Sequence, residues 1–328
     1  MKKMDRESVF IYDMMNRVIS GSDLSFEEAE RLINTSDLDT LTKCANIITR
    51  TFNGNRVDVE SLINAKSGNC PEDCHFCAQS SHHKLTGIRT YPLLPMDLIL
   101  QRAKEAKESG SKSFCLVCAY KSPPDKDFER ICETIVEIKK SLDIDVNASL
   151  GSITREQARR LKKVGVKRYN HNLETSESYF SNICKTHEFS DRFSTAKIVK
   201  EEGLELCCGG IIGMGEDTKQ RIELAFSIKS LEPDEIPLNI LMGRVGTPLA
   251  SQVKMDPVDA IRTIAVWRFI MPRGIIKIAG GREVNLKDED KTALKSGANG
   301  VITGGYLTTD GNSAAKDIAM IREIGLKA

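Results

Sequence analysis

The sequence predicts an α/β protein, a TIM-type (β/α)8 barrel that follows an N-terminal helical extension. Eight short apolar segments have the character of strands, and amphipathic segments with helical spacing separate them. Strands that alternate with helices are typical of parallel βαβ units, and eight such units favour closure into a barrel. The 328 residues suffice for one barrel with an extension. An open, doubly wound sheet would give the same alternation and is the alternative.

The N-terminal residues are predicted to be helical. Ser25 is a suitable N-cap for a helix that begins at Phe26, and residues 38–51 repeat apolar side chains at helical spacing. Strands are predicted at Val57–Asn64, Ser113–Cys118, Asp145–Leu150, Arg168–Asn172, Glu205–Ile212, Ile236–Met242, Ile275–Ile278 and Gly300–Thr303. Helices are predicted at 96–109, 127–142, 154–164, 188–202, 217–230, 256–270, 287–296 and 313–325. No Pro-, Gly- or Ser-rich linker interrupts the chain, so we divide it into an extension, 1–55, and a barrel, 56–328.

The charge balance excludes some classes of partner. The chain has 47 basic and 46 acidic side chains, so it lacks the positive field that nucleic-acid binding needs. No run of about 18 apolar residues could span a membrane. The first ten residues contain no continuous apolar stretch of the kind that a signal peptide has. We therefore expect a cytoplasmic protein that binds neither nucleic acid nor membrane.

The ten cysteines are the most unusual feature of the composition. A chain of this length without a secretion signal is not a disulfide scaffold, so clustered cysteines indicate metal binding or catalysis. Cys70, Cys74 and Cys77 form a C-x3-C-x2-C motif directly after the first predicted strand. Three thiolates can hold three irons of a four-iron cluster and leave the fourth iron free for another ligand. A zinc loop is the alternative, but it usually has four protein ligands, and no second pair of cysteines follows closely.

This motif, placed after the first strand of a barrel, resembles that of the radical S-adenosylmethionine (SAM) superfamily. The resemblance implies that Cys70, Cys74 and Cys77 hold a 4Fe-4S cluster whose open iron binds SAM. Reductive cleavage of SAM then yields a 5′-deoxyadenosyl radical. The residue between the last two cysteines is aromatic in that superfamily, and Phe76 fits this pattern beside the adenine.

Further segments resemble the biotin synthase family. They are Cys70–Ser80, Tyr169–Ser176, Cys208–Glu216, Pro237–Leu241, Gly246–Leu249, Ala279–Glu283 and Gly297–Thr309, and the resemblance covers about residues 20–326. It implies insertion of sulfur into dethiobiotin to form biotin. It also implies a reductant such as flavodoxin or ferredoxin, and a homodimer.

Polar residues at strand ends are candidates for ligand binding. Asn170, Asn172 and Glu174 alternate along the chain, so in an extended strand all three face the barrel mouth. A carboxylate such as that of Glu174, where the family usually has Asp, can accept hydrogen bonds from two ribose hydroxyls. The amides of Asn170, Asn172 and Asn239 can pair with a cyclic urea, while Ile211 supplies an apolar wall to the cofactor site. The alternative is that these asparagines only cap loops.

The sequence departs from the family at a second, sulfur-donating cluster. In the better-known members three cysteines and one arginine hold a 2Fe-2S cluster. Cys115 and Cys207 match two of these ligands, but Asn147 and Lys277 occupy the other two positions. Two more cysteines, Cys118 and Cys208, stand beside the matching pair.

We therefore hypothesise an auxiliary four-iron cluster held by three or four of Cys115, Cys118, Cys207 and Cys208. Lys277 would be a neighbour that donates a hydrogen bond to a sulfide or offsets the negative charge of the cluster. The alternative is that the second cluster is lost. Cys44, Cys132 and Cys184 have no partner nearby in the sequence, and we expect them to be buried as small hydrophobic residues.

Two other functions compete with the leading one. A related radical SAM enzyme could act on another small substrate, as a hydrogenase-maturation enzyme does. A noncatalytic iron–sulfur carrier is the third possibility, but a carrier has no need for polar side chains at the mouth of a barrel. The anaerobic products from SAM and dethiobiotin discriminate among the three.

Overall fold

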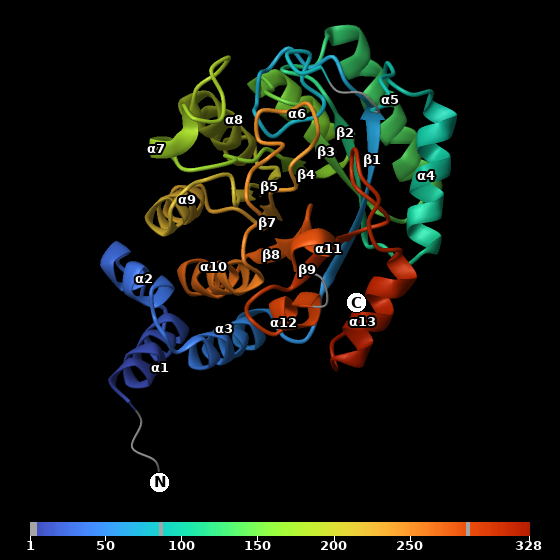
Figure 1. The fold of residues 1–328 in the computed structure, drawn as a ribbon. Coiled ribbons are helices and arrows are strands. Elements are labelled where there is room, and N and C mark those ends of the chain that lie inside the picture. The colour runs from blue at the N-terminus through green and yellow to red at the C-terminus, as the bar shows by residue number, and fades with distance from the viewer. Residues whose placement is uncertain (1–4, 85–87, 287–288) are drawn as a thin grey trace.

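The computed structural model describes residues 5–84, 88–286 and 289–328, which form a parallel barrel covered by helices (Figure 1). Each strand pairs in parallel with its neighbours, in the order β5-β4-β3-β2-β1-β9-β8-β7-β6, and a contact between β5 and β7 closes the sheet. The strands are β1 (Asp58–Lys66), β2 (Ser113–Cys118), β3 (Asp145–Ser149), β4 (Val166–Asn170), β5 (Glu205–Cys207), β6 (Gly210–Ile212), β7 (Glu235–Ile240), β8 (Ile275–Ile278) and β9 (Gly300–Thr303). The predicted barrel is confirmed.

One predicted strand, Glu205–Ile212, is in fact two short strands. β5 pairs with β4 and β6 pairs with β7, so the two halves together fill one of eight positions in the barrel. The break falls at Cys208 and Gly209. A side chain on Gly209 would meet the carbonyl oxygen of Pro237 at 1.9 Å, so only glycine lets the two strands approach so closely.

Three other strands end earlier than predicted, β3 by one residue, at Ser149. β4 ends at Asn170 instead of Asn172, and β7 ends at Ile240 instead of Met242. Asn172 and Glu174 therefore do not lie on a strand. Glu174 has a φ of 71°, so the extended alternation that placed it beside Asn170 is wrong in detail.

The described helices are α1 (Arg6–Ile19), α2 (Phe26–Ile33), α3 (Leu38–Asn53), α4 (Met96–Glu108), α5 (Asp125–Ser141), α6 (Arg155–Lys163), α7 (Glu177–Phe180), α8 (Phe189–Glu201), α9 (Thr218–Ser230), α10 (Pro257–Ile270), α11 (Arg282–Asn285), α12 (Asp290–Leu294) and α13 (Ala314–Glu323). Ser25 caps α2 in a capping box with Glu28, as predicted. The helix predicted at 287–296 corresponds to α12, and residues 287–288 lie outside the described residues.

The extension, α1–α3, packs on the barrel through α10, which lies between them (Figure 1). Ten residues of α10 are buried, Trp267 among them, because the helix meets the sheet on one side and the extension on the other. Thr263 and Arg268 are among the ten, so polar side chains are buried here too, and Asp259 in the first turn is exposed. No helix in the described ranges is both long and apolar enough to span a bilayer.

Candidate functional site

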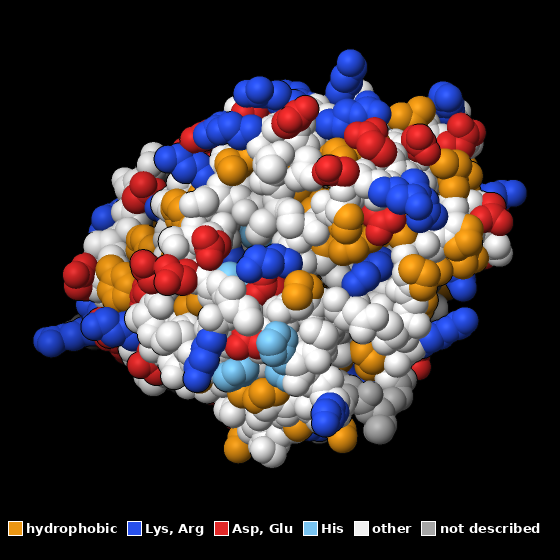
Figure 2. All heavy atoms as spheres, turned by 90° about the horizontal axis from the view of Figure 1, so that it is seen from above, with side chains coloured by type: hydrophobic (Ala, Val, Ile, Leu, Met, Phe, Trp, Pro, Cys, Tyr) orange, Lys and Arg blue, Asp and Glu red, His pale blue; other side chains and the backbone are white. Residues whose placement is uncertain are grey.

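A cavity of about 580 Å³ opens at the carboxyl ends of the strands. Its lining combines the three cysteines of the C-x3-C-x2-C motif with polar residues from β4, β7 and the segment after β4: Cys70, Cys74, Cys77, Asn170, Asn172, Glu174 and Asn239. A second cavity adjoins it and shares Phe76, Cys77 and Asn239, and Ile211 also lines this one. The residues predicted for cluster, SAM and substrate thus gather around one mouth. Basic and acidic side chains are interspersed on this face of the molecule (Figure 2).

The cysteine loop is held in shape by hydrogen bonds to the side chain of Gln79 and between its own backbone groups. Gln79 accepts hydrogen bonds at its side-chain oxygen from the backbone N–H of Gly68 (3.1 Å) and from Asn64 (3.2 Å). The N–H of Cys70 donates to the carbonyl of Gln79, and Ser81 donates back to Cys70. Gly68 has a φ of 73°, which suits glycine, at the start of this tight turn.

Asn170 is the asparagine with free capacity for a ligand. Its amide N–H₂ donates to the sulfur of Cys115 (3.4 Å), whereas its buried side-chain oxygen has no hydrogen-bond partner. The amides of Asn172 and Asn239 are already engaged. Asn172 accepts from Gly209 (3.1 Å), and Asn239 accepts from Gly280 (2.9 Å) while donating to the carbonyl of Gly210 (3.2 Å). The side chains of Asn172 and Asn239 therefore also hold loops in place, which is the role that the alternative interpretation of these asparagines predicted.

Arg192, on α8, is a residue of this site that the sequence did not suggest. Its guanidinium donates to the carboxylate of Glu174 (3.0 Å) and to the carbonyl of Asn172. Burial raises the pKa of Glu174, and Arg192 and Asn172 oppose that shift. Nothing in the sequence around Arg192, which lies near the start of a predicted helix, indicates that it would bind the carboxylate of Glu174.

Below the mouth, the barrel contains a buried ionic cluster. The ammonium of Lys277 lies 2.8 Å from Asp58, 2.6 Å from Glu60 and 2.7 Å from Glu235. Asn147 donates to Glu60 (2.6 Å), and Arg168 pairs with Glu235. Burial alone disfavours the charge on Lys277, but Glu235, Glu60 and Asp58 together raise its pKa well above the ordinary value.

The four cysteines predicted for the auxiliary cluster do not share one environment. Cys115 and Cys207 both adjoin the ionic cluster, and the thiol of Cys207 donates to Glu235 (3.2 Å). Burial, followed by Glu60 and Glu235, raises the pKa of the Cys115 thiol well above its ordinary value. Cys115 and Cys118 both line the cavity, and Cys118 also packs against the hydrophobic core, where burial raises its thiol pKa to about 12. Cys208 packs in the hydrophobic core, the placement expected for a neighbour of Cys207 in a strand.

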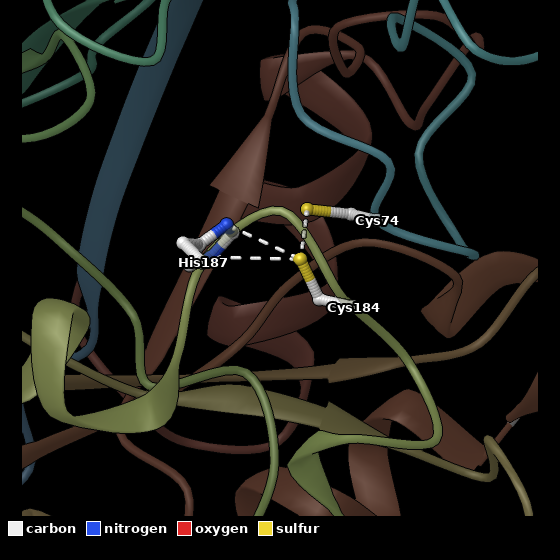
Figure 3. A group of neighbouring side chains, drawn as sticks. All are labelled: Cys74, Cys184 and His187. Carbon is white, nitrogen blue, oxygen red and sulfur yellow. Dashed lines mark hydrogen bonds between the residues drawn. The ribbon is translucent and has the colours of Figure 1, made fainter.

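Cys184 does not behave as the partnerless hydrophobe that the sequence predicted. It is buried, but its sulfur lies 4.0 Å from that of Cys74 and 3.2 Å from Nδ1 of His187 (Figure 3). The reason is tertiary: the segment between α7 and α8 is fastened against the cysteine loop. The backbone N–H of His75, in the cysteine loop, donates to the carbonyl of Ile183 (2.8 Å).

The residues at the mouth fit a 4Fe-4S cluster with SAM. Three cysteines border one cavity, and within the described chain they do not form a group tight enough for a single ion. Ligands of a cubane bind different irons, so a wider arrangement suits it. The oxygen of Asn170 and Nε2 of His171 are buried at the same cavity without partners. Such orphaned atoms are expected where a polar ligand binds.

Comparisons with known proteins define the class. Residues 65–227 match the radical SAM superfamily, and residues 237–327 match the Biotin and Thiamin Synthesis associated domain. The fold matches that of methylornithine synthase (TM-score 0.84, 20% identity, 96% of each chain). It also matches an FeFe-hydrogenase maturase from Carboxydothermus hydrogenoformans (TM-score 0.81, 18% identity, 96% of this chain and 78% of the other). The chain is a radical SAM enzyme.

Closer relatives give the family. The chain is 49% identical to a biotin synthase of Nitrosopumilus maritimus over 321 residues, which cover 97% of this chain and 98% of the relative. It is 45% identical to a biotin synthase of Clostridium tetani, over 96% of this chain and 98% of the relative. The chain therefore belongs to the biotin synthase family.

Proposed function

We propose that this chain inserts sulfur into dethiobiotin and so closes the sulfur-containing ring of biotin, with SAM as the source of the radical. The observation that carries the proposal is the single mouth at which Cys70, Cys74 and Cys77 meet the unpartnered amide oxygen of Asn170. These cysteines would hold the 4Fe-4S cluster. When bound, the cluster and SAM supply a 5′-deoxyadenosyl radical that abstracts hydrogen from unactivated carbon.

The chain's own residues bind and orient the reactants. Glu174 accepts hydrogen bonds from the ribose of SAM, and Arg192 holds that carboxylate in place. Phe76 and Ile211 give the adjoining cavity an apolar surface for the adenine. The amide oxygen of Asn170 accepts from a urea N–H of dethiobiotin, which leaves Asn172 and Asn239 chiefly to shape the mouth.

Anaerobic incubation with dithionite, SAM and dethiobiotin tests the proposal. We expect biotin and 5′-deoxyadenosine from the reconstituted enzyme, and neither from the Cys74→Ala variant. Deoxyadenosine without biotin would mean that the chain acts on another substrate. Absence of both products from a fully loaded enzyme would favour an iron–sulfur carrier.

We further propose that the sulfur comes from an auxiliary four-iron cluster held by three or four of Cys115, Cys118, Cys207 and Cys208. Cys115 and Cys207 support this because both border the same buried ionic cluster. Cys118 ends β2 and lines the same cavity as Cys115, whereas Cys208 packs in the core and joins only if the chain turns at the break before Gly209. The ammonium of Lys277 already contacts Asp58, Glu60 and Glu235, so it has no donor left for a sulfide and acts on the cluster only through this ionic group.

Iron and sulfide quantitation after anaerobic reconstitution tests the second cluster. Two four-iron clusters give about eight irons per chain, and the Cys115→Ala variant should retain about four. About four irons in the unsubstituted enzyme would contradict the auxiliary cluster. A flavodoxin- or ferredoxin-type reductant, a cytoplasmic location and a homodimer complete the proposal, and size-exclusion chromatography with light scattering tests the dimer.

A further inference from the structure

Cys74, Cys184 and His187 form the one group of His, Cys, Asp and Glu side chains in the described residues that is tight enough to hold a single metal ion. All their ligand atoms lie within 4.8 Å of one another. The two sulfurs are 4.0 Å apart, and Nδ1 of His187 is 3.2 Å from the sulfur of Cys184. Figure 3 shows the three side chains pointing toward one another from two separate segments.

These separations lie within a few tenths of an ångström of those around a tetrahedral ion. Metal–sulfur bonds of about 2.3 Å and metal–nitrogen bonds of about 2.0 Å place neighbouring ligand atoms about 3.5–3.8 Å apart. The Glu72 carboxylate lies 2.8 Å from Nδ1 of His187, as a hydrogen-bond partner outside this group, so the fourth position is left to water. Thiolate and imidazole ligands select Zn²⁺, Fe²⁺ or Co²⁺ over Mg²⁺ or Ca²⁺.

The group is assembled by contacts that need no metal. The carboxylate of Asp73 accepts hydrogen bonds from the backbone N–H groups of Lys185 (2.9 Å) and Thr186 (3.1 Å). Asp73 in turn donates its own N–H to the hydroxyl of Thr186 (3.0 Å). These bonds hold the cysteine loop against the segment that bears Cys184 and His187. Because Cys74 and His187 line the cavity, an ion can reach the group from solvent.

We propose that the cluster-free chain binds one divalent transition-metal ion through Cys74, Cys184 and His187, with water in the fourth position. Two thiols lose their protons to solvent as two metal–sulfur bonds form, and no electron is transferred. His187 binds through Nδ1, so its ring proton moves to Nε2 and its hydrogen bond to Glu72 is released. Arg192, 3.3 Å from that nitrogen, then gives up this contact but keeps its bond to Glu174.

The charges around the group suit such a complex. Two thiolates balance a divalent ion, and the carboxylate of Glu72 adds one negative charge. Lys121 lies 3.1 Å from the other oxygen of Glu72 and offsets this charge. Asp73 faces the sulfur of Cys184 at 3.1 Å, so a bound cation also gains a second carboxylate nearby.

The site has a consequence for cluster assembly, because Cys74 belongs to both sites. Mononuclear binding and the 4Fe-4S cluster are mutually exclusive at this sulfur. Zn²⁺ bound here therefore delays loading of the radical cluster. This consequence rests on the proposed function, in which Cys74 is a ligand of the 4Fe-4S cluster. Binding of the single ion does not depend on that proposal.

Titration of cluster-free, reduced protein with Co²⁺ tests the site without SAM, dethiobiotin or turnover. We expect one Co²⁺ per chain with the visible absorption of a tetrahedral thiolate complex. The Cys184→Ala variant should bind more than about 100-fold more weakly, since loss of an outer-shell partner alone costs about 10–100-fold. The Cys70→Ala/Cys77→Ala double variant is the matched control, because it removes two loop thiols but leaves the proposed ligands intact.

The opposite pattern, in which the double variant abolishes binding and Cys184→Ala does not weaken it, overturns the proposal. His187→Gln provides a second test if Cys184→Ala does not fold, and unchanged affinity in that variant also overturns it. In a second assay, one equivalent of Zn²⁺ added before reconstitution should slow the 410-nm absorbance gain of the unsubstituted protein more than that of Cys184→Ala. Equal slowing in both proteins counts against shared use of Cys74. A failure in either assay leaves the proposed biotin-forming activity untouched.

Discussion

Replacement of Lys277 by methionine removes the cation from a buried group of carboxylates. The Lys277 side chain is fully buried, and it contacts Asp58, Glu60 and Glu235 at 2.6–2.8 Å. Methionine has a similar length but no charge, so it keeps the packing and removes only the ammonium. Glu60 retains the hydrogen bond from Asn147, but its negative charge loses its cationic partner.

The magnitude follows from this burial. Breaking a buried ion pair by removal of one partner costs about 3–5 kcal/mol. At an unfolding entropy of about 2.1 cal/mol/K per residue, this lowers the Tm of a chain of 328 residues by about 4–7 °C. Lys277→Arg keeps the charge and should cost less than Lys277→Met. The double variant Lys277→Met/Glu60→Gln should recover part of the loss, because Glu60 has no other cationic partner among the described residues, whereas Glu235 keeps its ion pair with Arg168.

The pH dependence gives a second measure of the same effect. Burial raises the pKa of Glu235 and Lys277 opposes that shift, so without Lys277 this pKa is higher still. Such a group contributes stability below its unfolded pKa of about 4.3, and this contribution is lost as the pH rises through the folded pKa. The gap between the unsubstituted protein and Lys277→Met should therefore be larger at pH 8 than at pH 5.5. Urea unfolding of the cluster-free proteins measures it, and a pH-independent gap below 1 kcal/mol would refute the reasoning.

Three other substitutions test the site and the extension. Asn170→Ala should raise the KM for dethiobiotin up to about 10-fold, since a net hydrogen bond contributes about 0.5–1.5 kcal/mol; an unchanged KM would exclude Asn170 from the substrate site. Glu174→Gln should weaken equilibrium binding of SAM about 10- to 100-fold, because bonds to a charged acceptor contribute about 1.5–3 kcal/mol, while Glu174→Asp should keep most of the affinity. Asp37→Ala should lower stability by about 1 kcal/mol, because Asp37 caps α3 through Thr40 and accepts from Ser8. Hydrogen bonds from Ser8 and Thr40 lower the pKa of Asp37. The contribution of Asp37 to stability is therefore present above its unfolded pKa and is lost as the pH falls through its lower folded pKa. The difference in urea midpoint between the unsubstituted protein and Asp37→Ala should therefore shrink in acid.

Much of the fold could be predicted because its signals are local. The alternation of strands and helices depends on side-chain periods that neighbouring residues display, and it gave the barrel with nearly every element in place. The residues at which strands end were harder to predict from the sequence. The break at Gly209 and the early end of β4 depend on how closely β7 and the segment after β4 approach. Such an approach is a property of the assembled sheet, and neither segment displays it alone.

The functional site also has some features that the sequence predicts and others that it does not. The spacing of Cys70, Cys74 and Cys77 predicts cluster ligands by itself, because a short loop brings them to one place whatever the remaining fold does. The sequence also marked Lys277 and the extra cysteines as departures from the family. It did not show that Arg192 holds Glu174, or that the amides of Asn172 and Asn239 are already occupied.

By itself, then, the sequence determined the type of barrel, the radical SAM motif and the family to which the chain belongs. Only the tertiary structure decided which side chains meet. Lys277 is 217 positions from Glu60, and Cys74 is 110 positions from Cys184, yet each pair is in contact. The physical reason is that strand order and loop docking set these neighbours, whereas periodicity and motif spacing carry information over only a few residues.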